Sequence, residues 1–212
     1  MSLIETHFSC QPAEADLLVR LQSRRPGAFE ELLDLYQQPL YRFVFRLLED
    51  PSEAADVAQE VFIKVFLKVG GFRGDCSLKT WLYRIAVREA SNRRRWFRRH
   101  RRPETSFDPA EGAEGKEAAV FVDRSDTPFD VTYRHEQMAL IESALRTMDR
   151  RLRLAVILRD IEELSYNEIA EVMQVSLGTV KSRILRGRDA LRAALQEQMP
   201  AEAPEAAVLR AE

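Results

Sequence analysis

Apolar residues recur at helical spacing along most of this chain. The clearest example is Leu78, Trp81, Leu82 and Ile85, which stand at i, i+3, i+4 and i+7 and so share one face of a helix. The same spacing predicts helices over residues 13–23, 28–48 (with a break expected at Pro39), 51–68, 133–148, 152–161, 165–173 and 177–198. No segment alternates apolar and polar residues convincingly, as a half-buried strand would. The pattern predicts an all-α fold.

Two of the expected helices begin with clear capping signals. Asp50 precedes Pro51, a residue suited to the first helical position, and Glu53 follows three residues after the cap. Ser165 and Glu168 have the spacing of a capping box, in which each side chain accepts a hydrogen bond from the other residue's backbone. We therefore expect helices to begin directly after Asp50 and after Ser165.

The segment 103–130 divides the helical pattern in two. It contains proline and glycine among acidic residues, which is the composition of a flexible linker. We expect two small helical domains, 1–102 and 131–199, joined by this acidic linker and followed by a disordered Ala/Glu/Pro-rich tail over 200–212.

The net charge of -2 conceals a strong segregation of charge along the chain. Residues 84–102 hold nine Arg against one Glu, whereas 103–130 hold eight acids against two bases. Such blocks of like charge indicate local partners.

No apolar run is long enough to span a bilayer, and the N-terminus lacks the pattern of a secretory signal. Because the two cysteines and three histidines show no ligand spacing, we expect a cytoplasmic protein without metal or other cofactor.

Residues 165–184 have the pattern of a helix-turn-helix, with a short helix, a three-residue turn and a second helix capped by Ser176. Gln174 stands where the turn usually has glycine, whose freedom suits a left-handed backbone. A stripe of three basic residues and one leucine runs along the second helix, separate from its apolar face: Lys181, Leu185, Arg188 and Arg192, flanked by Ser182, Arg186 and Asp189. Such a helix can enter a major groove; the alternative is a solvated basic face.

A glycine loop joins an aromatic and basic helix over residues 72–86. Aromatic rings beside cations suit single-stranded nucleic acid, because bases stack on the rings while arginines follow the backbone. Trp81 belongs to the apolar stripe, so it has the alternative role of a core residue, and Phe72 and Tyr83 are the better candidates for base contacts. Arg93, Arg94 and Arg95 have the alternative of being a solvated helix end.

The chain resembles the extracytoplasmic-function (ECF) sigma factors of the bacterial sigma-70 family over about 28–102 and 133–195. The segments that carry the resemblance are Gly27-Ala28-Phe29-Glu30-Glu31-Leu32 for region 2.1, Asp56-Val57-Ala58-Gln59-Glu60-Val61-Phe62 for region 2.2, Thr80-Trp81-Leu82-Tyr83-Arg84-Ile85-Ala86 for regions 2.3 and 2.4, and Gly178-Thr179-Val180-Lys181-Ser182-Arg183 for region 4.2. It implies a protein that binds core RNA polymerase, recognises the −10 and −35 promoter elements and promotes promoter opening.

The resemblance also implies roles for individual residues. Contacts with the clamp helices of the polymerase β′ subunit are implied for Asp56, Gln59, Glu60, Phe62 and Lys64. Contacts with the opened −10 element are implied for Phe72, Trp81, Tyr83, Arg84, Arg88, Asn92 and Arg95. Contacts with the −35 duplex are implied for Thr179, Lys181, Ser182, Arg183, Leu185, Arg186 and Arg188. The β flap and an anti-sigma factor are further implied partners.

Two other functions compete with this interpretation. A stand-alone helix-turn-helix regulator would explain 165–192 but would leave 56–66 and 72–102 without a role. An enzyme is the weakest alternative, because the sequence shows no metal-ligand cluster, no phosphate-binding glycine motif and no paired nucleophile and base.

Overall fold

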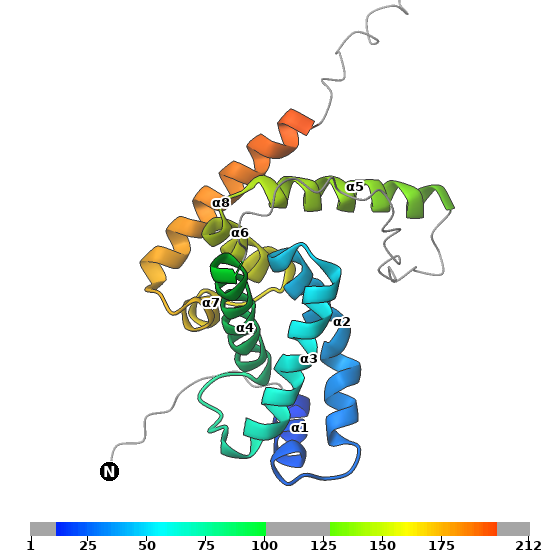
Figure 1. Cartoon of the computed structure of the whole chain (residues 1–212), viewed down its shortest axis with the longest axis vertical. Coiled ribbons are helices and arrows are strands. Elements are labelled where there is room, and N and C mark those ends of the chain that lie inside the picture. The colour runs from blue at the N-terminus through cyan, green and yellow to red at the C-terminus, as the bar shows by residue number, and fades with distance from the viewer. Residues whose placement is uncertain (1–11, 101–127, 199–212) are drawn as a thin grey trace, which may run out of the picture.

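The computed structural model describes residues 12–100 and 128–198, and these form helices joined by short loops (Figure 1). The expected linker and tail lie outside the described residues, except that helix α5 already begins at Pro128. The helices are α1 (Pro12–Gln22), α2 (Ala28–Leu48), α3 (Pro51–Lys68), α4 (Leu78–His100), α5 (Pro128–Thr147), α6 (Arg150–Val156), α7 (Tyr166–Met173) and α8 (Leu177–Gln198). Two short helical turns, η1 (Val69–Gly71) and η2 (Ile157–Ile161), extend α3 and α6. The all-α prediction is confirmed.

Helices α1 to α4 pack around one apolar core. α2 runs unbroken through Pro39, so the expected interruption is wrong. α3 begins as predicted, because the side chain of Asp50 accepts a hydrogen bond from the backbone N–H of Glu53 and Pro51 occupies the first turn. That hydrogen bond is the main cause that lowers the pKa of Asp50. The core side chains come from all four helices: Leu17, Leu21, Leu32, Phe43, Val44, Val57, Val61, Val65, Leu82 and Ala86.

The helix-turn-helix forms as predicted at the other end of the chain. Ser165 and Glu168 make a complete capping box at the start of α7. Gln174 adopts the left-handed conformation that ends α7, with φ 53° and ψ 51°. The hydroxyl of Ser176 accepts a hydrogen bond from Thr179 N at 3.3 Å and caps α8. A glutamine therefore holds a turn conformation that is easier for glycine.

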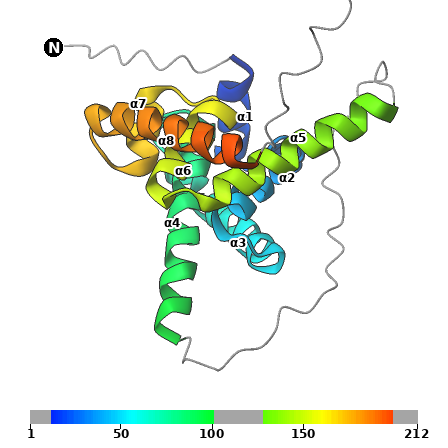
Figure 2. The same ribbon diagram turned by 90° about the horizontal axis from the view of Figure 1, so that it is seen from above.

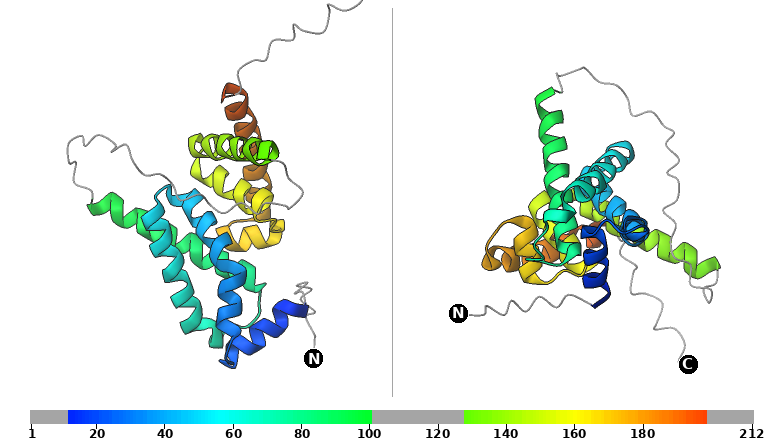
Figure 3. Two further views of the ribbon diagram at one scale, coloured as in Figure 1. Left: turned by 90° about the vertical axis from the view of Figure 1, so that its right-hand side faces the viewer. Right: turned by 90° about the horizontal axis from the view of Figure 1, so that it is seen from below.

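The two helical groups lie against each other through α4. One side of α4 packs on α2 and α3, and its N-terminal part also packs against α7. The C-terminal half of α4 projects beyond the rest of the molecule (Figure 2). Views from two other sides show α7 beside α4, and α5 near the end of α2 (Figure 3).

Close packing of α6 against α8 depends on Gly187, a residue that the helical periodicity did not single out. A Cβ atom at this position would lie 2.5 Å from Val156 Cγ2 and 3.1 Å from the carbonyl oxygen of Leu152. At Gly178, in the first turn of the same helix, a Cβ atom would meet nothing within 4 Å. The absence of a side chain at Gly187 thus sets the distance between the two helices.

We expect Gly187→Ala to lower the free energy of unfolding by about 1–2 kcal/mol. Alanine favours a helix interior by about 1 kcal/mol over glycine, but the displaced backbone and Val156 cost more, as overpacking does. Urea unfolding followed by circular dichroism measures the change. The matched control is Gly178→Ala, which we expect to be neutral or slightly stabilising. Equal stability of the two variants would contradict this packing constraint.

Candidate polymerase and promoter interfaces

Helix α3 presents an exposed stripe on the side away from the core. Asp56, Gln59 and Glu60 lie on it, as expected for residues that contact a partner. Lys64 is partly exposed and lies 2.5 Å from the carboxylate of Glu89 on α4. In contrast, the exposed fraction of Phe62 is 6%, so the structure places this candidate in the apolar core. Helical periodicity explains the difference, since Phe62 follows Val61 on the inward side of the helix.

Two apolar residues missing from the candidate set continue the exposed stripe of α3. Ile63 is 51% exposed and Leu67 is 69% exposed. With Asp56, Gln59 and Glu60 they stand at i, i+3, i+4, i+7 and i+11 along one face. Assigning Val57, Val61 and Val65 to the core first would have left these two residues on the outer face. The stripe therefore combines acidic and polar side chains with exposed apolar ones.

Four of the candidates for −10 contacts share one face of α4. Arg84 is partly exposed, and Arg88, Asn92 and Arg95 are exposed, at successive helical turns. The last three follow the part of α4 that projects from the molecule (Figure 2). This face offers cations and an amide along its whole length.

The aromatic candidates are placed differently. Phe72 is half-buried and its ring stacks on that of Trp81, with centroids 4.6 Å apart and an interplanar angle of 22°. Trp81 is 8% exposed and Tyr83 is 1% exposed. Tyr83 packs edge-on against Phe43 in the core, so in this arrangement it does not face solvent. Of the two favoured candidates for base contacts, only Phe72 reaches the surface.

Two arginines of the basic segment 84–102 interact with other residues of α2 and α3. Arg93 forms ion pairs with Glu53 and with Asp56, the latter at 2.8 Å, and the hydrogen bond with Glu53 is the main cause that raises its pKa. Arg94 donates to the carbonyl of Leu47 at 3.1 Å. These two arginines therefore tie the middle of α4 to α2 and α3, whereas Arg95 stays exposed.

Helix α8 carries the expected basic stripe. Lys181, Leu185 and Arg186 are exposed, with Leu185 at 64%. Arg186 Nε donates to the carbonyl of Ser182 at 3.2 Å, which aligns its side chain along the helix. Thr179 lies in the first turn and is partly exposed. The N-terminal half of α8 thus offers a cation, hydroxyls and an apolar side chain on its outer surface.

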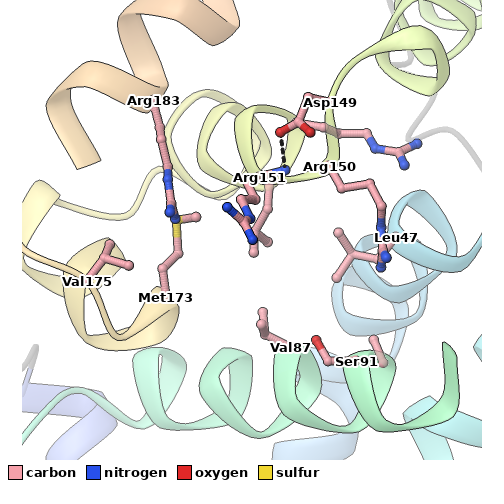
Figure 4. Close-up of a pocket in the computed structure, with 12 residues that line it drawn as sticks. Leu47, Val87, Ser91, Asp149, Arg150, Arg151, Met173, Val175 and Arg183 are labelled. Atoms are coloured by element: carbon pink, nitrogen blue, oxygen red, sulfur yellow. Dashed lines mark hydrogen bonds between the residues drawn. The ribbon is translucent and has the colours of Figure 1, made fainter. Parts of the chain in front are cut away.

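Two arginines of α8 that are candidates for −35 contacts have other surroundings. Arg188 pairs with Asp160, and its Nε lies 3.0 Å from Asp160 Oδ2; this hydrogen bond raises the pKa of Arg188. Arg183 points to the other side of the helix, toward Met173 and the space between the domains (Figure 4). The structure therefore separates Arg183 from Lys181 and Leu185.

That space is an open cleft of about 690 Å³ between the two helical groups. Its apolar lining comes from both sides and includes Leu47 and Val87 on one side and Met173 on the other, while arginines of α6 lie along its upper edge (Figure 4). Asp149 caps α6 there, and its Oδ1 accepts from Arg151 N at 2.9 Å. The two groups are therefore incompletely packed against each other at this end of their contact.

At the other end of the contact, Glu168 joins α7 to α4. Its Oε1 accepts from Thr80 Oγ1 at 2.8 Å and lies 3.0 Å from Ser77 Oγ, while its Oε2 accepts from Ser165 N at 2.9 Å. Although burial acts in the opposite direction, the hydrogen bonds from Ser165, Thr80 and Ser77 together lower the pKa of Glu168. The same carboxylate therefore starts α7 and binds the first turn of α4.

Glu162 makes a second contact with α4. Tyr83 donates its hydroxyl to Glu162 Oε2, and Lys79 Nζ donates to the Glu162 carbonyl at 2.6 Å. Burial raises the pKa of Glu162, although the hydrogen bond from Tyr83 and the charges of Lys79, Arg46 and Arg42 partly offset it. Burial and the neighbouring carboxylate of Glu162 in turn raise the pKa of the Tyr83 hydroxyl.

Cys76 lies in the loop before α4 and is 5% exposed. Burial, the largest cause, raises the pKa of its thiol to about 11, with the carboxylates of Glu171 and Glu168 adding to the effect. Among the described residues, no three His, Cys, Asp or Glu side chains form a group suited to a metal ion. The described helices also include none that is both long and apolar enough to cross a membrane.

Family comparisons agree with the two helical groups. The family model for Sigma-70 region 2 matches residues 32–102, and the one for Sigma-70 region 4 matches 138–191. The RNA polymerase sigma-H factor of Pseudomonas aeruginosa is 40% identical over 186 residues, covering 88% of this chain and 95% of that protein. The chain belongs to the ECF sigma factors of the sigma-70 family. It is also 35% identical to the ECF RNA polymerase sigma-E factor of Escherichia coli K12 over 184 residues, 87% of this chain and 95% of that protein.

Two solved structures have a similar fold. CnrH, solved with the cytosolic domain of CnrY, matches with a TM-score of 0.63 at 22% identity and covers 88% of this chain and 99% of its own. RpoE of Bartonella quintana, solved with the anti-sigma factor NepR, matches with a TM-score of 0.61 at 23% identity, covering 82% and 99%. The region 2 match begins within α2 and includes α3 and α4, and the region 4 match begins within α5 and ends within α8.

Proposed function

We propose that this sigma factor binds core RNA polymerase, recognises the −35 and −10 promoter elements and promotes promoter opening. The observation that carries the proposal is the presence of three separate exposed faces of different chemistry, on α3, α4 and α8. Family membership supports the same assignment. Recognition and strand capture require no catalytic residue of this chain, and we place its action in the cytoplasm with polymerase and DNA.

The exposed stripe of α3 is the proposed contact with the clamp helices of β′. Exposed apolar residues rimmed by charged ones mark protein–protein interfaces. Ile63 and Leu67 would supply the apolar area, and Asp56, Gln59 and Glu60 the polar rim. Phe62 would act indirectly, by keeping α3 in place from the core. The β flap is a further proposed contact on polymerase.

The faces of α4 and α8 are the proposed promoter contacts. In the loop before α4, Phe72 offers a ring for a flipped or stacked base, and on α4 Arg84, Arg88, Asn92 and Arg95 follow the strand. Single-stranded nucleic acid is commonly held in this way. On α8 the outer side chains fit a recognition helix in the major groove of the −35 duplex: Thr179, Lys181, Ser182, Leu185 and Arg186. Arg188 reaches phosphate only if it leaves Asp160.

An anti-sigma factor is the proposed regulator. One solved neighbour, the sigma factor RpoE, was solved with the anti-sigma factor NepR, and another, CnrH, was solved with the cytosolic domain of CnrY. A protein that covers any of the three faces would block transcription. Binding of an anti-sigma factor to this chain therefore belongs to the proposal.

Run-off transcription with core polymerase on a library of promoter fragments tests the function as a whole. We expect transcripts only when both core and the sigma factor are present, and selection of fragments that share two spaced elements. If the purified protein neither co-purifies with core nor directs initiation, the proposal is wrong. Tight duplex binding without polymerase would instead favour a stand-alone regulator.

We expect Leu67→Glu to weaken binding to core polymerase at least about tenfold, because a carboxylate would be buried without a partner in an apolar contact. A titration of labelled sigma factor with core measures the affinity. Val19→Glu is the matched control, since Val19 is a 57% exposed apolar residue on α1. Equal loss in both variants would argue against the α3 face.

We expect Lys181→Ala combined with Arg186→Ala to reduce initiation from −35-dependent promoters about tenfold or more, since contacts to bases and phosphates are lost. Core binding should stay unchanged. Arg151→Ala, an exposed arginine that lines the cleft instead, serves as the control for lost charge. Parallel loss of core binding and −35 use in the double variant would count against the assignment.

A further inference from the structure

Arg188 lies on the face of α8 that is proposed to meet the −35 duplex, but its charged group is tied to another part of region 4. Lys181, Leu185 and Arg188 stand at i, i+4 and i+7 along α8, so they share one face of the helix. All three residues are exposed. The guanidinium of Arg188 nevertheless reaches Asp160, which belongs to the turn η2 and precedes it by 28 residues.

The contact between Arg188 and Asp160 uses both oxygens of the carboxylate. Arg188 Nε lies 3.0 Å from Asp160 Oδ2, and Arg188 Nη2 donates to Oδ1. The planar guanidinium binds carboxylate and phosphate groups in this same two-pronged geometry. The side chains of Arg188 and Asp160 remain 49% and 34% exposed, so the pair lies at the surface. Asp160 therefore gives Arg188 the kind of partner that a DNA phosphate would give it.

Arg159 precedes Asp160 in η2 but has other partners. Its Nη1 donates to the carbonyl of Leu164 at 2.9 Å, and its guanidinium lies 5.2 Å from the centroid of the Tyr166 ring. These contacts direct Arg159 to the loop before α7 and to the first residue of that helix. The arginine that neutralises Asp160 in this arrangement is therefore Arg188, which comes from the recognition helix.

We propose that Asp160 is a specificity-determining residue of the −35 surface, because it holds Arg188 as an internal substitute for a DNA phosphate. This inference rests on the proposed function of α8. Contacts with phosphate carry no sequence information, so an arginine held by a carboxylate adds little to the binding of random duplex. Binding then depends more on side chains that meet base edges in the groove, Lys181 and Leu185 among them.

Release of Arg188 has a recognisable salt signature. Each phosphate that a protein neutralises adds about 0.9 to the slope of log affinity against log salt concentration. In the wild type, transfer of Arg188 to a phosphate leaves the carboxylate of Asp160 beside a polyanion, and like charges repel. The pair as a whole therefore adds little to the slope. Asp160→Asn removes the competing charge at nearly constant size and leaves Arg188 available to the DNA.

The first test measures the affinity of the full chain for a random-sequence duplex of about 25 base pairs, by fluorescence anisotropy between about 50 and 200 mM salt. Glu163→Gln is the matched control, because Glu163 is exposed and the substitution makes the same change in net charge. We expect Asp160→Asn to bind about three- to fivefold more tightly than Glu163→Gln, which is the upper range for an exposed ion pair. Its salt slope should be larger by about 0.9.

Arg188→Gln completes a double-mutant cycle. In this background we expect Asp160→Asn to gain no more affinity than Glu163→Gln does, because the arginine that it would release is gone. Asp160→Ser removes the same charge and replaces Asp160→Asn if that variant folds poorly.

Three results would overturn the proposal. The first is equal affinity and equal salt slope in Asp160→Asn and Glu163→Gln. The second is a gain that persists in the Arg188→Gln background, because the carboxylate would then act by repelling phosphates directly. The third is weaker binding by Asp160→Asn, because Asp160 would then hold Arg188 in position to contact the DNA.

Run-off transcription separates failure of this proposal from failure of the proposed function. With core polymerase and a promoter fragment selected from the library, we expect random duplex to inhibit Asp160→Asn at about threefold lower concentration than Glu163→Gln. Equal inhibition of the two variants would show that Asp160 has no part in specificity. If the wild type directs no transcription with core, the proposed function fails, whereas the duplex affinities and salt slopes still show whether Asp160 withholds Arg188 from DNA.

Discussion

The structure depends on how the two oxygens of one carboxylate are used. Glu168 Oε2 completes the capping box that starts the helix-turn-helix, and Oε1 binds the hydroxyls at the start of α4. Folding of α7 therefore places an acceptor where region 2 offers donors. Because an unsatisfied buried acceptor or donor is costly, local order in region 4 and its contact with region 2 support each other. The shared residue Glu168 thus links the start of α7 to the position of region 4 on region 2.

Much of the fold could be predicted because its signals are local. The cap at Asp50, the capping box at Ser165 and the turn at Gln174 depend on neighbours within a few residues, and the structure confirms all three. Helix α2 passes through Pro39 because packing of its apolar face on α3 outweighs the loss of one backbone hydrogen bond. A proline rule applied to the sequence alone has no access to that packing.

The candidate surfaces were harder to predict because they depend on contacts between distant segments. The resemblance implied Arg88, Asn92 and Arg95, and these residues share one face because all three belong to one helix. Helical periodicity could not reveal that Tyr83 donates a hydrogen bond to Glu162, which lies 79 residues away in the sequence. Family motifs favoured Phe62 over its neighbour Ile63, although only Ile63 is exposed. Motif matching marks a segment, and burial then decides which of its side chains can meet a partner.

The five-residue turn η2 has a consequence for how the domains align. Residues Ile157–Ile161 wind as a π-helix between α6 and the loop before α7. A π turn holds more residues than an α turn and so shifts the angular position of the residues after it, by about 100° for each residue inserted. Glu162 comes directly after this turn. The winding of this single turn thus sets the direction in which the Glu162 side chain points. An insertion or deletion of one residue in η2 would therefore turn Glu162 away from α4, although every residue that makes the contact would be unchanged.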